Sequence, residues 1–263
     1  MKYYDQHIHS SFSKDSEEDL ENYFIKAKEN GIEYVITCEH FDPHTSVDGT
    51  SWDADYDALI AYQKKLKEKY PMITPLLGIE LGYRKEYMDE MEEKLINHSF
   101  DLVQLSVHDS GVYDFYYPEF YHNPSENLNG YFDLVLEAIT NWTDYDVLSH
   151  IDFAFKTARY VMKDIQLKEF EEKVTKILLK LINDEKALEI NTKVQETIDD
   201  ELHVKYLLLL YKKLGGYKVT LSSDAHSQDR YLSSFDKYIK LIKSCGFDEL
   251  RYYIKRKEYI FKI

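Results

Sequence analysis

The sequence has few cysteines, prolines and glycines, and each shortage excludes a class of protein. Two cysteines in 263 residues, Cys38 and Cys245, are too few for a disulfide framework and are typical of a reduced cytosolic protein. With five prolines and nine glycines, no Pro/Gly/Ser-rich linker divides the chain. No apolar run approaches the ~20 residues of a membrane-spanning helix, and the N-terminus lacks the basic and apolar regions of a signal peptide. We therefore expect a cytoplasmic protein with no membrane partner, folded as a single domain over residues 1–263.

Basic side chains are also scarce. The chain has 33 lysines and arginines against 48 aspartates and glutamates, which gives a net charge of −15. Non-specific binding to nucleic acid needs a dominant basic surface, so the composition argues against a nucleic-acid partner. It is compatible with a cleft whose local charge is reversed by bound cations.

Short apolar runs alternate along the chain with longer amphipathic segments. The runs are rich in Val, Ile, Leu and Tyr, as buried parallel strands are. They cover residues 3–9, 33–40, 72–81, 100–108, 145–152, 187–192 and 217–226. Seven β-then-α units predict an α/β fold of the (β/α) barrel type, with fewer than eight strands. A doubly wound open sheet is the alternative, because the order of strands cannot be read from the sequence.

The amphipathic segments repeat apolar residues at helical spacing. We expect helices near 20–31, 128–139, 170–181, 202–215 and 232–246. The first is preceded by Ser16-Glu17-Glu18-Asp19, which resembles a capping box, and Gly31 has the position of its C-terminal stop.

Metal-binding side chains fall at the C-terminal ends of six of the seven runs. They are His7, His9, His40, Glu80, His108, His150, Asp224 and His226. In parallel β/α folds these ends converge on one rim, where active sites lie. Any one of these residues alone would more often be a hydrogen-bonded strand end, a cap or a turn residue. Their recurrence at the same end of each run predicts a metal site.

The ligand types restrict the metal. Imidazole and carboxylate without thiolate suit zinc, manganese, iron or cobalt, and disfavour all-oxygen sites for Ca²⁺ or Mg²⁺. Cys38 lies two residues before His40 and could add a thiolate, although a buried strand cysteine is the preferred interpretation. Seven or eight ligands exceed one tetrahedral site and imply at least two ions, bridged by a carboxylate such as Glu80.

These residues, in this order, resemble the PHP (polymerase and histidinol phosphatase) superfamily. The matching pattern is H-x-H (His7, His9), Asp15 in FSKDS, His40 in CEH, Glu80 in GIEL, His108 in SVH, His150 in SHID, and Asp224-x-His226 in SSDAH. The match spans nearly the whole chain. The stretches LSVHDSGVYDFYYPEFY, LSHIDF and LEINT are similar to the histidinol-phosphate phosphatase branch. The resemblance implies a distorted (β/α)7 barrel, TIM-like, with its active site at the C-terminal ends of the strands.

The resemblance also implies three divalent transition-metal ions, with zinc, manganese and iron as candidates. The first ion would be held by His7, His9, Glu80 and Asp224, the second by Glu80, His108 and His150, and the third by Asp15, His40 and His226. Glu80, Asp224 and His226 would carry the catalytic metal chemistry. Without the resemblance, Asp15 is equally well explained as a residue just before a helix cap.

For the substrate, Arg159 in IDFAFKTARY resembles a family arginine that clamps the phosphate, a task that suits bidentate geometry. Relatives have a second arginine after LEINT, where this chain has Glu196 near the expected place. Lys193 or Arg230 could supply the charge instead, although Lys193 is equally well explained as a solvated surface lysine. The resemblance implies a phosphomonoesterase for a small phosphorylated metabolite, with L-histidinol phosphate, an intermediate of histidine biosynthesis, as the leading candidate.

In the mechanism that this site suggests, two ions activate a hydroxide that attacks phosphorus, and the third ion and an arginine neutralise the phosphate oxygens. His44, Asp42 and Tyr117 are alternative general acids for the leaving group. Two other functions compete: a nuclease or nucleotide phosphoesterase of the same superfamily, and a non-catalytic metal-binding domain. The number of ligands argues against the latter, because structural sites usually close with four. The oligomeric state stays open.

Overall fold

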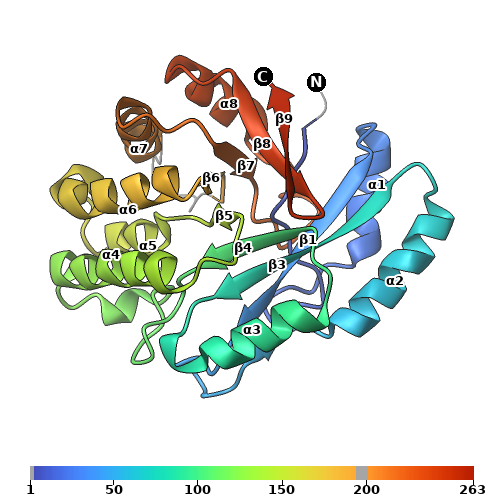
Figure 1. Cartoon of the computed structure of the whole chain (residues 1–263), viewed down its shortest axis with the longest axis horizontal. Coiled ribbons are helices and arrows are strands. Elements are labelled where there is room, and N and C mark those ends of the chain that lie inside the picture. Colours follow the sequence, from blue (N-terminus) through green and yellow to red (C-terminus); the bar gives the residue numbers. More distant parts are fainter. Residues whose placement is uncertain (1–2, 194–200) are drawn as a thin grey trace.

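The computed structural model describes residues 3–193 and 201–263, in which a curled sheet is surrounded by helices (Figure 1). The sheet has the strand order β2-β1-β3-β4-β5-β6-β7. Its strands are β1 (Tyr34–Asp42), β2 (Trp52–Asp53), β3 (Thr74–Gly82), β4 (Leu102–Ser106), β5 (Val147–Leu148), β6 (Ala187–Asn191) and β7 (Val219–Ser222). All neighbours are parallel except β2, which pairs antiparallel with β1 and lay outside the predicted strands.

The N-terminal segment connects the two sides of this sheet. Residues 3–9 were predicted as a strand, but of these only Ile8 forms a β-bridge, parallel to Ala225. The carbonyl oxygen of Ile8 accepts a 2.9 Å hydrogen bond from the backbone N–H of Cys38 on β1, and His9 N–H donates to the Ala225 carbonyl at 2.8 Å. The segment therefore lies between β1 and the end of β7. With sequential strand order, this is the distorted TIM-like (β/α)7 barrel expected, and the doubly wound alternative is wrong.

The segment does not form a full strand because side chains take up its polar groups. The Gln6 carbonyl accepts the side-chain amide of Gln104 and the thiol of Cys38, and the His7 N–H donates to the Asp5 carboxylate. These bonds replace the regular ladder of a strand.

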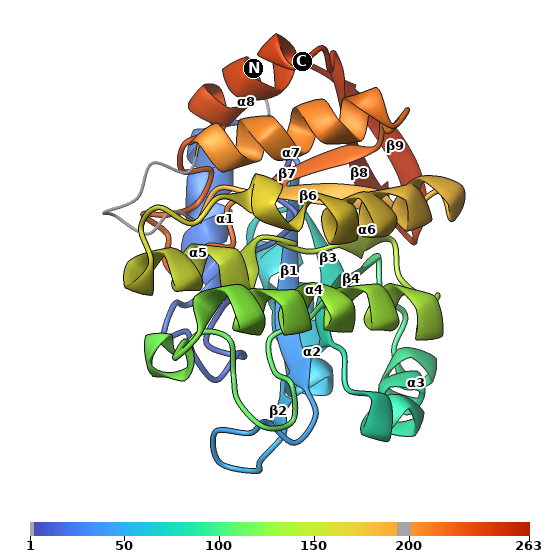
Figure 2. The ribbon, with the colours of Figure 1, turned by 90° about the vertical axis from the view of Figure 1, so that its left-hand side faces the viewer.

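The helices cover the outer face of the sheet (Figures 1 and 2). They are α1 (Leu20–Glu29), α2 (Tyr56–Lys69), α3 (Met88–Asn97), α4 (Pro124–Asn141), α5 (Phe153–Val161), α6 (Glu171–Asn183), α7 (Glu201–Lys213) and α8 (Phe235–Ser244). Three 3-10 turns accompany them: η1 (Lys85–Tyr87), η2 (Pro118–Phe120) and η3 (Leu167–Phe170). The five predicted helices correspond to α1, α4, α6, α7 and α8. No helix in the described residues is long and apolar enough to cross a membrane.

The first helix begins at Leu20 as predicted, but the expected capping box is wrong. The N-cap of α1 is Asp19, whose side chain accepts the Glu21 N–H, whereas Ser16 accepts only the N–H of Glu18. The predicted start of α8 at Leu232 fails because Leu232 and Ser234 have positive φ angles of 60° and 63°, which are incompatible with a right-handed helix.

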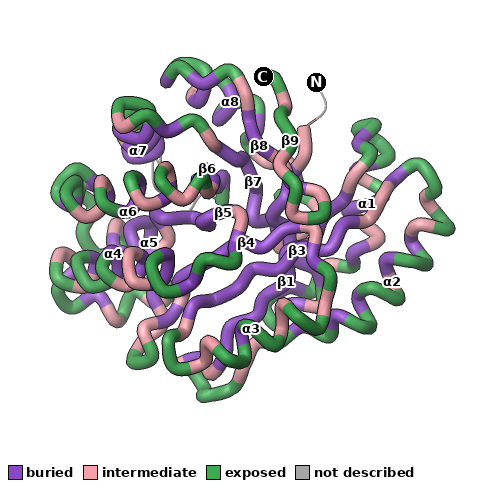
Figure 3. The backbone as a smooth tube through the Cα atoms, in the orientation of Figure 1, coloured by how far each residue is buried: buried purple, intermediate pink, exposed green. Residues whose placement is uncertain are grey.

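The burial of the strands and helices explains why their apolar patterns could be recognised in the sequence. The parallel strands of the sheet are buried almost throughout, and the helices bury their inner faces while their outer faces are exposed (Figure 3). On α6, for example, Val174, Ile177, Leu178 and Leu181 are buried, which is the apolar stripe seen in the sequence.

A C-terminal hairpin, which the sequence did not predict, closes the N-terminal end of the barrel. Its strands β8 (Glu249–Ile254) and β9 (Lys257–Lys262) pair antiparallel. Tyr253 on β8 packs with Ile36, Cys38, Leu76 and Leu102. These residues lie early in or midway along their strands, so the hairpin seals this end and leaves the opposite end for a site. The Cys38 thiol is buried here and donates to the Gln6 carbonyl, which confirms the buried-cysteine interpretation.

Candidate metal centre

All nine expected ligands lie together at the C-terminal end of the barrel. They form four overlapping groups whose ligand atoms lie within 4.8 Å of one another: His9, Asp15, His40 and His226; His7, His9 and Asp224; His7, Glu80 and His150; and His40, Glu80 and His108. The strands place six of these side chains, because His40, Glu80, His108, His150, Asp224 and His226 lie in the last part of a strand or within four residues after it. His7 and His9 come from the N-terminal segment, on either side of the Ile8 bridge. Asp15 comes instead from the loop before α1. The geometry can hold metal ions.

The first expected set surrounds two unpaired imidazole nitrogens. His7 Nε2 lies 3.2 Å from Glu80 Oε2, and His9 Nε2 lies 3.3 Å from Asp224 Oδ1. Both nitrogens are buried and form no hydrogen bond among the described residues. A buried polar atom without a partner is costly, so the arrangement fits nitrogens that bind an ion.

The second expected set gathers around the other oxygen of Glu80. Glu80 Oε1 lies 2.7 Å from His150 Nε2 and 3.1 Å from His108 Nε2. The two oxygens of one carboxylate therefore face two different histidine sets. Such an arrangement would allow Glu80 to bridge two ions, which is the role that the sequence predicts for it.

The third expected set is centred on Asp15. Its Oδ2 lies 2.8 Å from His226 Nε2 and 3.5 Å from His40 Nε2. The ring of His9 lies against both histidines: it stacks on His40 at a centroid distance of 4.4 Å and is tilted against His226 at 4.3 Å. Asp15, the ligand with the weakest independent support in the sequence, thus has the surroundings that the resemblance implies.

Three further carboxylates support the rings, and sequence reasoning gave none of them this role. Glu189 Oε1 lies 2.7 Å from His7 Nδ1, and Asp42 Oδ1 lies 2.7 Å from His108 Nδ1. His9 Nδ1 lies 3.2 Å from Ser13 Oγ, which donates to Glu39 at 2.6 Å. Carboxylates in this position fix the tautomer and orientation of metal-binding histidines. The available signal was a glutamate inside an otherwise apolar strand, as in LEIN on β6.

The charges of the cluster are strongly coupled. Burial raises the pKa of Glu80, but His7, His108 and His40 outweigh it and hold that pKa well below its ordinary value. Burial lowers the pKa of His108, but Asp42 and Glu80 outweigh it and raise the pKa to about 10. Burial also raises the pKa of Glu39, to about 7, even though Ser10 and other donors bond it. The carboxylates are therefore ready to balance several positive charges, protons or metal ions alike.

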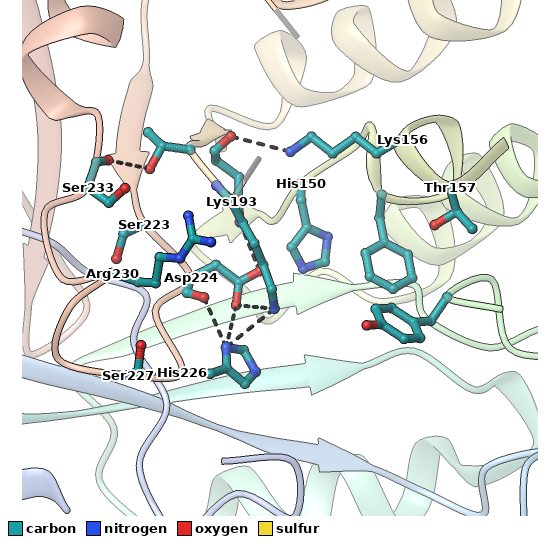
Figure 4. Close-up of a pocket in the computed structure, with 14 residues that line it drawn as sticks. His150, Lys156, Thr157, Lys193, Ser223, Asp224, His226, Ser227, Arg230 and Ser233 are labelled. Atoms are coloured by element: carbon teal, nitrogen blue, oxygen red, sulfur yellow. Dashed lines mark hydrogen bonds and ion pairs between the residues drawn. The ribbon is translucent and has the colours of Figure 1, made fainter. Parts of the chain in front are cut away.

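A polar cavity of about 340 Å³ opens beside the cluster (Figure 4). Lys156, Lys193 and Arg230 supply cationic groups to its lining. Lys193 Nζ lies 3.2 Å from Asp224 Oδ1 and 3.3 Å from His226 Nδ1, at the edge of the metal centre. Lys156 was not singled out from the sequence; its Nζ lies 3.4 Å from Asp152 and bonds the Asn191 carbonyl.

The other substrate residues are placed less directly. Arg159 lies on α5, three residues after Lys156, and is half-buried, but it does not line either cavity at the centre within the described residues. Glu196, near the expected place of the second arginine, lies outside the described residues.

The three alternative general acids differ in position. Asp42 and Tyr117 line a second cavity of about 410 Å³ that also contains the metal cluster. Both oxygens of Asp42 face histidines, and these lower its pKa to about 2 against the effect of burial, so it is not a proton donor near neutral pH. His44 Nε2 lies 3.3 Å from Glu90, its ring stacks on Tyr87, and it lines neither cavity within the described chain.

Comparisons with known proteins show which family the chain resembles. A family model described as PHP domain matches residues 5–193. The histidinol-phosphatase of Lactococcus lactis subsp. lactis (strain IL1403) is 33% identical over 257 residues, which cover 95% of this chain and 94% of the relative.

Two solved structures are similar to this chain over most of its length. A crystal structure of histidinol phosphate phosphatase from the same Lactococcus strain, complexed with zinc, L-histidinol and phosphate, has a TM-score of 0.89 at 31% identity. It covers 98% of this chain, and this chain covers 99% of it. A structure from Listeria monocytogenes has a TM-score of 0.72 at 19% identity, covering 89% of this chain and 99% of that one, and at this identity it shows a shared fold only.

Proposed function

Because this chain belongs to the PHP domain family, we propose that it is a metal-dependent phosphatase that hydrolyses L-histidinol phosphate to L-histidinol and phosphate. The relative that is 33% identical over nearly the whole chain is a histidinol-phosphatase, and the similar Lactococcus structure contains L-histidinol and phosphate. The observation that carries the proposal is the position of Glu80, whose two oxygens face separate histidine sets.

The residues present fit three divalent ions, of which zinc is the first candidate because the Lactococcus structure contains it. The sets that would hold them are His7, His9, Glu80 and Asp224; Glu80, His108 and His150; and Asp15, His40 and His226. Manganese and iron suit the same nitrogen and oxygen donors. When bound, such ions polarise a phosphate ester and lower the pKa of water, which is the chemistry that hydrolysis needs.

The protein's own side chains prepare this site. Glu189 and Asp42 hold the rings of His7 and His108, so that the ligand nitrogens keep their orientation without ordering during the reaction. Lys193 and Arg230 lie on the polar side, where their charges would pair with the phosphate oxygens and with the negative charge that develops on them.

We also propose that residues 1–263 act as one catalytic domain. The family match ends at residue 193, but Asp224 and His226 come from the segment after β7. Without that segment, the first and third ligand sets would each lose a member.

The test is a panel of phosphate esters given to the zinc-loaded protein. We expect kcat/KM for L-histidinol phosphate to exceed that for 4-nitrophenyl phosphate by at least about tenfold, which corresponds to roughly 1.4 kcal/mol of preferential transition-state binding. Elemental analysis of the same protein should give two or three transition-metal equivalents. Equal kcat/KM values for the two esters would contradict L-histidinol phosphate as the substrate. A protein that cannot be loaded with metal would contradict the metal-dependent mechanism.

A further inference from the structure

The two cavities at the metal centre differ in the charges of their walls. The 340 Å³ cavity has the cations Lys156 and Arg230 in its wall (Figure 4). The 410 Å³ cavity lacks both of these and has the carboxylates Asp109 and Asp114 instead. Lys193 and two aromatic residues, Tyr116 and Phe153, line both cavities. The cleft therefore has a cationic side and an acidic side, with aromatic rings and the metal centre between them.

The aromatic residues of the second cavity are Trp52, Tyr116, Tyr117 and Phe153. Phe153 packs against two of the expected metal ligands, with ring centroids 5.0 Å from His108 and 5.1 Å from His150. A flat or apolar group of a ligand would thus find ring surfaces directly beside the reacting centre.

Of the acidic residues there, Asp109 is fully used by the protein itself. Its carboxylate accepts the N–H groups of Ser46 and Gly111 and pairs with Arg84, at 2.7, 2.5 and 3.2 Å respectively. These bonds tie together the loops that follow β1, β3 and β4. Asp109 therefore has a structural explanation and needs no ligand.

Asp114 is different, because its charge has no partner of opposite sign in the described part of the chain. Its Oδ1 accepts the N–H of Tyr116 at 2.7 Å. Among the described residues, no Lys, Arg or His side chain lies within the 4.0 Å of an ion pair. Burial raises the pKa of Asp114 to about 6, and the neighbouring charges of Asp109 and Asp42 also raise it, although the Tyr116 N–H and His108 lower it. A half-buried carboxylate in a cavity wall, surrounded by other acids, is the complement of a cation.

We propose that Asp114 binds the protonated amine of the leaving alcohol, while the rings of Trp52, Tyr117 and Phe153 surround its imidazole. The inference rests on the proposed function, since L-histidinol phosphate carries both groups. The phosphate would then lie toward Lys193 and Arg230, and the alcohol on the opposite side. Asp114 is thus a specificity residue, because esters without an amine gain nothing from it.

The test compares Asp114→Asn with wild type on three esters. These are L-histidinol phosphate, 3-(imidazol-4-yl)propyl phosphate, which lacks only the amine, and 4-nitrophenyl phosphate. Asparagine keeps the side-chain oxygen that accepts the Tyr116 N–H, so the turn is preserved while the charge is removed. Glu119→Gln is the matched control: Glu119 lies in the same loop on η2, is exposed and lines neither cavity.

We expect Asp114→Asn to lower kcat/KM for L-histidinol phosphate by at least about tenfold, the loss of one hydrogen bond to a charged group, and to leave the other two esters within about twofold. The inhibition constant of L-histidinol as a competitive product should rise by a similar factor. An equal loss on all three esters, or no loss on any, would overturn the inference. If wild type itself shows no preference for L-histidinol phosphate, the proposed function fails; if that preference survives Asp114→Asn, only this inference fails.

Discussion

His7 Nδ1 lies 2.7 Å from Glu189 Oε1, and both side chains are fully buried. The other oxygen of Glu189 accepts the backbone N–H of His150 at 2.8 Å. One glutamate on β6 therefore orients His7 and fixes the backbone of His150, a residue of a different set. With a proton on Nδ1 shared with Glu189, the neutral His7 ring presents its free Nε2 to the metal centre.

We predict that Glu189→Gln weakens zinc binding by about 10- to 100-fold, because the neutral amide stabilises the oriented ring less than a carboxylate does. Competition with a zinc chelator at fixed pH measures this. Glu185→Gln is the control, since Glu185 is exposed and lies just before the same strand. Unchanged zinc affinity in Glu189→Gln would show that the 2.7 Å contact does not contribute to metal binding.

The pH dependence of metal binding follows from the same electrostatics. His108 has a pKa of about 10 in the metal-free protein, since Asp42 and Glu80 outweigh the opposing effect of burial. A bound metal ion needs the neutral ring, so zinc must displace this proton at neutral pH. We predict that the apparent zinc affinity rises by about tenfold or more per pH unit between about pH 6 and pH 8, after correction for the chelator's own protonation. An affinity that is flat over this range would contradict the raised pKa.

Zinc affinity should rise with pH, whereas the stability of the metal-free protein should fall with pH. The pKa of His108 is raised on folding from about 6.5, so the bound proton stabilises the fold. This contribution is complete below about pH 6.5 and is lost as the pH rises through about 10. The free energy of unfolding of chelator-treated protein, from urea titrations, should therefore fall between these pH values, and it should fall less in His108→Gln.

The sequence was most informative where periodicity and position at a strand end coincide. Alternation along an extended segment places His7 and His9 on one face, and the structure brings both to the same cluster. The strand ends of a parallel barrel converge for geometric reasons, so His40, Glu80 and His150 could be grouped without knowing any contact.

Contacts that depend on loop conformation or on the choice of partner could not be predicted in this way. Nothing in the strand pattern says that Glu189 faces His7 while Asp42 faces His108, since both pairings cross from one strand to another. The two-residue strand β2 pairs with only two residues of β1, Phe41 and Asp42, and so short a run has no periodicity to detect.

The closing hairpin was missed because its outer strand shows little burial. Along β9 every residue is exposed or half-buried, so the segment lacks the apolar face by which a strand is recognised. Yet Tyr253, on its partner β8, is buried in the cluster that seals the barrel. The sequence shows an aromatic residue at position 253 but does not show the apolar residues against which it packs.

We predict that Tyr253→Ala lowers the free energy of unfolding by about 3–5 kcal/mol, the usual cost of truncating a buried aromatic side chain. Tyr259→Ala, at a partly exposed position on β9, should cost less than about 1 kcal/mol. Urea unfolding of both variants gives the comparison. Because Tyr253 lies at the end opposite the metal centre, zinc affinity of the folded variant should stay within about twofold of wild type; an equal stability loss in both variants would contradict the sealing role.

The last prediction concerns the cations of the polar cavity. Lys193 and Arg230 line it beside Asp224 and His226 (Figure 4), whereas Arg159 lies on α5 outside its lining. We expect Arg230→Ala to raise KM for L-histidinol phosphate by about tenfold or more, as loss of a charge-assisted bond to phosphate does, with zinc content unchanged. For Arg159→Ala the same result is expected on the family resemblance alone, since Arg159 does not line the cavity.

Lys193→Ala should have a further effect, because Lys193 Nζ lies 3.2 Å from Asp224 Oδ1 and opposes a bound cation there. Removing it should raise KM while zinc affinity stays equal or increases. Lys205→Ala, an exposed position on α7, is the control that should change neither quantity. If a variant loses zinc and activity in equal proportion, the substituted residue supports the metal centre instead. For Arg159, this result would contradict a role in phosphate binding.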